Sequence, residues 1–143
     1  LELSHNGYWH WGKIKVNQQL NYSYLRSQTM AVYGYGEKAN QLAYVPFHRA
    51  SLGLGFSYQK WQVLYNQNFT DHYFTTGSNN VYMPAYSVSQ LSLRCANLLK
   101  SKQHRLEASF SIFNLFDYPY QVLPYRPEPG LNFNLQITYA FAR

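Results

Sequence analysis

The sequence predicts an all-β fold, an antiparallel transmembrane β-barrel segment of about six strands. Three observations support this: a composition rich in aromatics and poor in charge, apolar and polar residues that alternate one by one, and connections that alternate between short and long. Tyr, Phe and Trp make up 19% of the 143 residues, while Asp, Glu, Lys and Arg make up 13%, about half the share in a typical soluble domain. A wall whose residues face lipid and water in turn needs such a composition.

The last segment, residues 131–141, shows the alternation most clearly. Every second residue is apolar, and the residues between are mostly amides and hydroxyls. Because successive side chains of a strand point to opposite faces, the segment has one apolar and one polar face. Its length is about what a tilted strand needs to cross a bilayer. Four further segments alternate in the same way with few exceptions: residues 13–24, 51–58, 61–69 and 105–112.

A sixth strand is predicted over residues 86–97, but its apolar residues change phase. Tyr86 and Val88 share one parity, whereas Leu91 and the apolar residues after it have the other. A β-bulge near Gln90 would return the apolar residues to one face. A misassigned register would produce the same pattern, so both explanations stay open.

The connections between these strands indicate which way the wall faces. Residues 59–60 and 98–103 are short, whereas residues 29–46, 71–85 and 116–130 are long and rich in Gly, Pro, Asn and Tyr. Bacterial barrels have short periplasmic turns and longer extracellular loops. We therefore expect the long connections to face outward and the C-terminus to be periplasmic. Aromatic residues then fall at the periplasmic interface: Trp9, Trp11, Trp61, Tyr139 and Phe141.

Three motifs resemble the C-terminal third of a TonB-dependent receptor. Residues 44–50, YVPFHRA, resemble the family's entry into a descending strand. Residues 109–117, SFSIFNLFD, followed by Tyr120, resemble its penultimate strand, and residues 125–130, YRPEPG, resemble the approach to its last strand. The resemblance implies the C-terminal end of a 22-stranded barrel. It also implies an N-terminal plug domain inside the barrel and a short segment that binds the energy-transducing partner TonB.

We expect residues 1–143 to be the C-terminal part of such a receptor, with the plug domain and the remaining strands outside the chain. Six strands are fewer than the roughly eight of the smallest single-chain barrels, and two open sheet edges would aggregate. A fragment, or one piece of a nicked or split receptor, explains both points. The expected partners are outer-membrane lipid, the plug, the remaining strands, the TonB complex and a small-molecule nutrient.

Other function classes are disfavoured. The net charge of +6 does not gather into a basic patch with interleaved aromatics, so no nucleic-acid partner is expected. Neither a metal site nor a cofactor is expected, because the histidines are scattered and Cys95 is the single cysteine. Asp71 with His72, or Ser109 with His104, could suggest a hydrolase, but no third catalytic group is identifiable. We expect no enzymatic activity.

Two groups of residues are candidate sites. In the outer loops and rim, arginines could bind a carboxylate or catecholate, and tyrosines could form a vestibule for a bulky ligand; both could equally have structural roles. These residues are Arg49, Tyr73, Tyr82, Tyr125 and Arg126, with Tyr33 and Tyr35 as further loop tyrosines. On the polar face of the wall, residues would contact the plug: Arg105, Glu107, Asn132, Asn134 and Gln136.

The function expected from the resemblance is TonB-energised uptake of a bulky, scarce nutrient of the siderophore, haem or cobalamin class. A passive outer-membrane channel, or a small stand-alone barrel, could be built from the same strands. An outer-membrane hydrolase is a third alternative.

Overall fold

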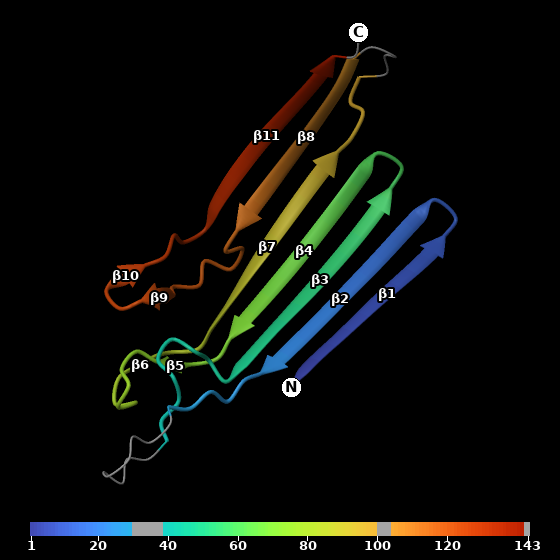
Figure 1. Ribbon diagram of the computed structural model, residues 1–143. Coiled ribbons are helices and arrows are strands. Elements are labelled where there is room, and N and C mark those ends of the chain that lie inside the picture. Colours follow the sequence, from blue (N-terminus) through green and yellow to red (C-terminus); the bar gives the residue numbers. More distant parts are fainter. Residues whose placement is uncertain (30–38, 100–103, 142–143) are drawn as a thin grey trace.

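The computed structural model describes residues 1–29, 39–99 and 104–141. These residues form one antiparallel sheet of seven long strands in the order β1-β2-β3-β4-β7-β8-β11 (Figure 1). The strands are β1 (Glu2–Trp11), β2 (Ile14–Tyr24), β3 (His48–Tyr58), β4 (Trp61–Thr70), β7 (Tyr86–Cys95), β8 (His104–Phe113) and β11 (Asn132–Phe141). Two small ribbons pair β5 (Tyr73–Phe74) with β6 (Tyr82–Met83), and β9 (Gln121–Leu123) with β10 (Arg126–Pro127). The all-β antiparallel prediction is confirmed.

The long strand β1 was not predicted, so the expected count of six was one too low. Polar and apolar residues do not separate onto the two faces of β1: His5 and Gly7 lie on the same face as Trp9 and Trp11. Nevertheless all ten residues of β1 pair with β2, from Glu2 opposite Ser23 to Trp11 opposite Ile14. Tertiary pairing decides this strand where periodicity is too weak to reveal it.

The predicted β-bulge near Gln90 is wrong. The pairing of β7 with β4 runs without a register shift from Cys95 opposite Trp61 to Tyr86 opposite Thr70. The change of phase in the sequence is therefore real. The polar Ser87 and the buried Ser89 lie on the otherwise apolar face, whereas Tyr86 and Val88 lie on the polar one.

The register sorts the sheet into an apolar and a polar face, because residues directly opposite on paired strands share a face. One row of the apolar face crosses all seven strands: Trp9, Val16, Phe56, Val63, Leu93, Phe110 and Leu135. A neighbouring row of the polar face is His10, Lys15, Ser57, Gln62, Arg94, Ser109 and Gln136. Within the described residues, no second layer of the protein covers the apolar rows: Phe133 is 76% exposed and Ile137 is 66% exposed. Such a surface requires an apolar solvent.

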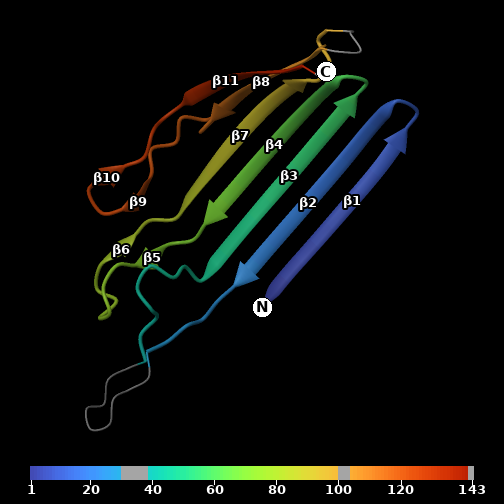
Figure 2. The ribbon, with the colours of Figure 1, turned by 45° about the horizontal axis from the view of Figure 1, so that its top comes forward.

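Connections of different length leave the two ends of the sheet. At one end β1 and β2 are joined by Gly12 and Lys13, and β3 and β4 by Gln59 and Lys60. At the other end lie three long connections: residues 25–47 (the first, described outside 30–38), 71–85 (the second) and 114–131 (the third). Figures 1 and 2 show the two small ribbons and the N-terminus at this end, with the C-terminus at the opposite one. The predicted alternation of short and long connections is confirmed where the structure describes the chain, whereas most of the short connection predicted at residues 98–103 lies outside the described residues.

No helix among the described residues has the length and apolar character to cross a membrane.

Candidate functional site

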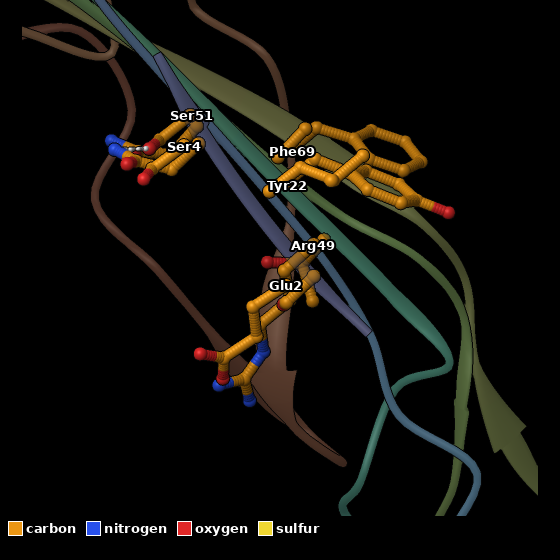
Figure 3. A pocket seen from close by; sticks show the side chains of 12 residues that line it. Glu2, Ser4, Tyr22, Arg49, Ser51 and Phe69 are labelled. Carbon is orange, nitrogen blue, oxygen red and sulfur yellow. Dashed lines mark hydrogen bonds between the residues drawn. The ribbon is translucent and has the colours of Figure 1, made fainter. Parts of the chain in front are cut away.

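The long-connection end of the polar face carries a hollow across strands β1 to β4. Register places Glu2, Ser23, Arg49 and Thr70 in one row there. Figure 3 shows Glu2, Ser4, Arg49 and Ser51 on one side of the strands and Tyr22 and Phe69 on the other. The lining of the hollow is mixed: hydroxyl and amide side chains of the polar face lie among apolar groups, and Asn21 Nδ2 donates to Ser51 Oγ at 3.1 Å. Arg49 thus lies on the polar face at the rim, where its parity in the sequence placed it.

A cluster of tyrosines lies beside Arg49, where all three long connections meet. The Tyr73 and Tyr44 rings are 6.3 Å apart, and the Tyr86 and Tyr120 rings are 5.0 Å apart. Tyr73 is only 4% exposed, and its hydroxyl donates to the carbonyl of Val122 at 2.6 Å. This predicted vestibule residue therefore packs inside the loops rather than lining an open surface.

Electrostatics in this cluster favour neutral tyrosines. Burial raises the pKa of Tyr73, the neighbouring Tyr86, Tyr44 and Glu128 add to the rise, and the Arg49 guanidinium opposes it. Burial also raises the pKa of Tyr120, with smaller contributions from Glu128 and Tyr86. Both hydroxyls therefore remain hydrogen-bond donors over the physiological pH range.

The other predicted ligand residues lie apart from this cluster. Tyr82, in β6, is 61% exposed, and its ring is 6.2 Å from that of His72. Tyr125 is 97% exposed at the turn between β9 and β10, and Arg126 follows it in β10. Described contacts do not join these three side chains to Arg49. Tyr33 and Tyr35 lie outside the described residues.

Sequence reasoning missed Tyr44, Tyr86, Tyr120 and Glu128 as members of the cluster. Tyr44 and Tyr120 belong to motifs singled out in the sequence, and Tyr86 begins a predicted strand. Their proximity depends on how two long connections fold onto each other, which strand periodicity does not report.

A second group of charges lies on the polar face toward the short-turn end. Glu107 accepts from Arg94 Nη2 at 2.6 Å through one oxygen and pairs with Arg105 Nη2 at 2.5 Å through the other. Gln136 and Thr138 of β11 line the adjoining hollow with Arg94 and Glu107. Of the predicted plug-facing residues, Arg105, Glu107 and Gln136 thus come together, and Arg94 is an addition. Asn132 and Asn134 lie farther along the same face of β11.

The N-L-F-D motif holds the third long connection together. The buried Asn114 accepts from the N–H of Tyr118 at 2.9 Å and donates to the carbonyls of Tyr118 and Pro129 at 2.9 and 3.3 Å. Asp117 Oδ1 accepts from the N–H of Leu131 at 2.7 Å. One side chain thus spans the base of the connection, and another fixes the entry to β11.

The two pairs that suggested hydrolysis do not form catalytic groups. Ser109 lies on the polar face, whereas His104 lies on the apolar face and contacts the hydroxyl of Tyr139 at 2.6 Å. Asp71 and His72 are bonded to each other at 2.8 Å within one loop. In the part of the chain that the structure describes, no three His, Cys, Asp or Glu residues gather in a way that could hold a metal ion.

A two-faced antiparallel sheet with short turns at one end and long, packed connections at the other is the wall of an outer-membrane β-barrel. Residues 1–115 match the family described as TonB dependent receptor-like, beta-barrel, and the chain belongs to this family. No curated protein matches the chain. The family consists of outer-membrane receptors and transporters that work with a plug domain and TonB. The chain is therefore part of a transport protein and not an enzyme.

Proposed function

We propose that the chain forms the C-terminal part of the barrel wall of a receptor for TonB-energised uptake of a bulky, scarce nutrient of the siderophore, haem or cobalamin class. The observation that carries this proposal is the pairing of a two-faced wall with a rim site on its polar face. Arg49, the tyrosine cluster and the packed connections lie at the same end of that wall.

The long connections face outward and the C-terminus is periplasmic in this proposal. Connection length supports the orientation, as do aromatic side chains on the apolar face at the short-turn end. Trp9 and Trp11 lie in or next to the β1–β2 turn region, Trp61 starts β4, and Tyr139 and Phe141 end β11. Tryptophan and tyrosine at that depth anchor a barrel at the boundary between lipid and water.

The polar face meets the plug, and both sheet edges continue into the remaining strands of the receptor. Within the described sheet, β1 and β11 each pair on one side only. The plug contacts are hydroxyls and amides along β11, together with the group of Glu107, Arg94 and Arg105. Contacts of this kind exchange with water at little cost, which would let a plug move when TonB pulls on it.

Ligand capture is assigned to Arg49 at the rim and to Tyr82, Tyr125 and Arg126 in the connections. Arg49 is exposed, and none of the ion pairs among the described residues includes it. Its guanidinium is therefore available to bind a carboxylate or catecholate with two parallel hydrogen bonds. The exposed rings of Tyr82 and Tyr125 provide aromatic surface for a bulky ligand.

The test is uptake by the intact receptor in cells with and without functional TonB, using ferric siderophore, haem and cobalamin as probes. We expect uptake of one probe that stops when TonB is absent, and weaker binding of that probe by Arg49→Gln. Lys60→Gln, in a turn at the opposite end, is the control. Uptake that persists without TonB would identify a passive channel and overturn the proposal. Failure of all three probes would overturn the nutrient class.

A further inference from the structure

The first and second long connections are joined by backbone and amide hydrogen bonds. The N–H of Tyr44 donates to the carbonyl of Phe74 at 2.7 Å, and Asn40 Nδ2 donates to the carbonyl of Gly77 at 2.9 Å. The buried Gln41 braces the base of the first connection. Its Oε1 accepts from the N–H of Ser27 at 3.0 Å, and its Nε2 donates to the carbonyl of Leu25 at 3.2 Å. These two connections therefore act as one unit.

The third long connection is attached to this unit through Tyr73. The Tyr73 hydroxyl, from β5, donates to the carbonyl of Val122 in β9, 49 residues along the chain. Among the described hydrogen bonds, no other joins the third connection to the second. Contact between Tyr86 and Tyr120 supports the same junction from the wall. Among the described residues, the hairpin of β9 and β10, which carries Tyr125 and Arg126, is thus joined to the second connection by one hydrogen bond, from a buried hydroxyl.

We propose that Tyr73 is a positioning residue whose hydroxyl fixes the β9–β10 hairpin against the other two connections, so that the three form one preorganised cap over the end of the wall. Its value for capturing a nutrient rests on the proposed function, whereas the attachment itself does not. A loop held in its binding geometry before the ligand arrives gives up less entropy on binding. Tyr73 therefore acts on ligand affinity without touching the ligand.

The competing explanation is that the Tyr73 ring merely fills space between loops. The two explanations differ at one atom, because Tyr73→Phe keeps the ring and removes the donor. Tyr44→Phe is a matched control: it lies beside Tyr73, is 48% exposed, and its hydroxyl makes no hydrogen bond among the described residues. If the ring alone matters, both variants behave like the unmodified receptor.

The experiment measures hairpin position in the intact receptor, in a Cys95→Ala background, with spin labels at Val81→Cys and Leu123→Cys. Both sites are exposed, and they lie on the two connections that Tyr73 joins. We expect Tyr73→Phe to broaden the distance distribution between the labels. It should also speed hydrogen exchange of the Glu128 amide, whose N–H donates to the carbonyl of Tyr120. The expected increase in exchange rate is roughly fivefold, because one hydrogen bond is lost. Tyr44→Phe should change neither quantity.

An unchanged distribution and exchange rate in Tyr73→Phe would overturn the inference. If that variant does not fold, the labelled receptor that keeps Tyr73 is measured as pH rises until Tyr73 ionises, since a tyrosinate cannot donate to Val122. The groups facing Tyr73 are Tyr44, Tyr86, Arg49 and Glu128. Labels that keep their distance through that ionisation overturn the attachment. These measurements use no ligand, so a receptor that fails every uptake probe can still pass them, and the two failures remain distinguishable.

Discussion

The carboxylate of Asp117 accepts a hydrogen bond from the backbone N–H of Leu131, across the 14 residues that separate them in the third long connection. Leu131 immediately precedes β11, so this bond fixes where the last strand begins. Asp117 itself is held because its N–H donates to the carbonyl of Asn114 at 2.8 Å. The end of β8 and the start of β11 are thereby locked together beneath the β9–β10 hairpin.

We expect Asp117→Ala to loosen the first residues of β11. It removes the acceptor for the exposed Leu131 N–H bond and places alanine at a φ of +51°, for a combined loss of about 2 kcal/mol. Hydrogen exchange at Leu131 measures the effect directly. Asp117→Asn keeps an oxygen acceptor in the same place and should exchange nearly as slowly as the native protein. Equal exchange rates in Asp117→Ala and the native protein would contradict this role.

Gly130→Ala should disturb the same bond from the other side. A Cβ at Gly130 would lie 2.6 Å from Asp117 Oδ1, so one of the two must move. We expect destabilisation of about 1–2 kcal/mol in denaturant unfolding. Because the clash needs the carboxylate, the substitution should cost much less in an Asp117→Ala background. Additive effects of the two substitutions would show that they act independently.

Asn114→Ala should be more damaging than either. The side chain is 3% exposed and makes three hydrogen bonds. Its removal leaves their partners without a hydrogen bond and should lower the free energy of unfolding by about 2–4 kcal/mol. Asn114 also has a φ of +51°, a left-handed conformation that alanine tolerates poorly. Asn114→Gly also removes the side chain, but glycine adopts this conformation without strain. It should therefore be about 1 kcal/mol more stable than Asn114→Ala in the free energy of unfolding. If the two variants are equally stable, backbone conformation plays no part.

The two faces of β11 should respond oppositely to charge. Leu135 belongs to the apolar row that crosses the sheet, and Asn134 is its neighbour on the polar face. Leu135→Arg places a guanidinium in lipid near mid-span and should cost about 2–4 kcal/mol, whereas Asn134→Arg should cost little. Folding of the intact receptor into lipid vesicles, titrated with denaturant, measures both. A larger cost at Asn134 would mean that the faces are reversed.

Alkaline pH should open the loop cluster. Burial raises the pKa of Tyr73 and of Tyr120 in the folded protein, while tyrosines of the unfolded chain ionise at about pH 10. Their contribution to stability is therefore complete below about pH 10 and is lost as pH rises through the raised values. Spectrophotometric titration should show that Tyr73→Phe and Tyr120→Phe each remove one late-ionising group. Loss of an early-ionising group instead would contradict the burial argument.

The sequence predicts the wall far better than the loops, and the reason is periodicity. A strand such as β11 can be recognised from local sequence because the polarity of each residue indicates the face of the sheet on which it lies. Strand β1 escapes this rule since His5 and Gly7 interrupt its apolar face, and only pairing with β2 reveals it. Gln67 is a polar residue at an apolar-face position of β4, and the sequence alone shows this. Its hydrogen-bond partners could not be predicted: it accepts from the Tyr65 hydroxyl at 2.5 Å and donates to Ser87 Oγ at 2.6 Å.

The candidate site follows the same division. The position of Arg49 on the polar face could be predicted from parity alone, because the strand fixes it. The burial of Tyr73 could not, since it results from a contact with Val122 that spans 49 residues and has no local signature. Loop tyrosines look alike in sequence, yet Tyr73 is enclosed and Tyr125 is almost fully exposed.

Two short turns at one end set the pairing of two hairpins of the wall. Gly12 and Gln59 adopt the left-handed conformation, with φ of +58° and +52°, that closes the β1–β2 and β3–β4 hairpins. Because hairpin register is decided by its tight turn, these two turns fix which residues of β1 and β2, and of β3 and β4, lie opposite each other. Strand pairing is thus specified from both ends of the sheet: by tight turns for β1–β2 and β3–β4, and through the long connections, with contacts such as that of Asp117 with Leu131, for β2–β3, β4–β7 and β8–β11.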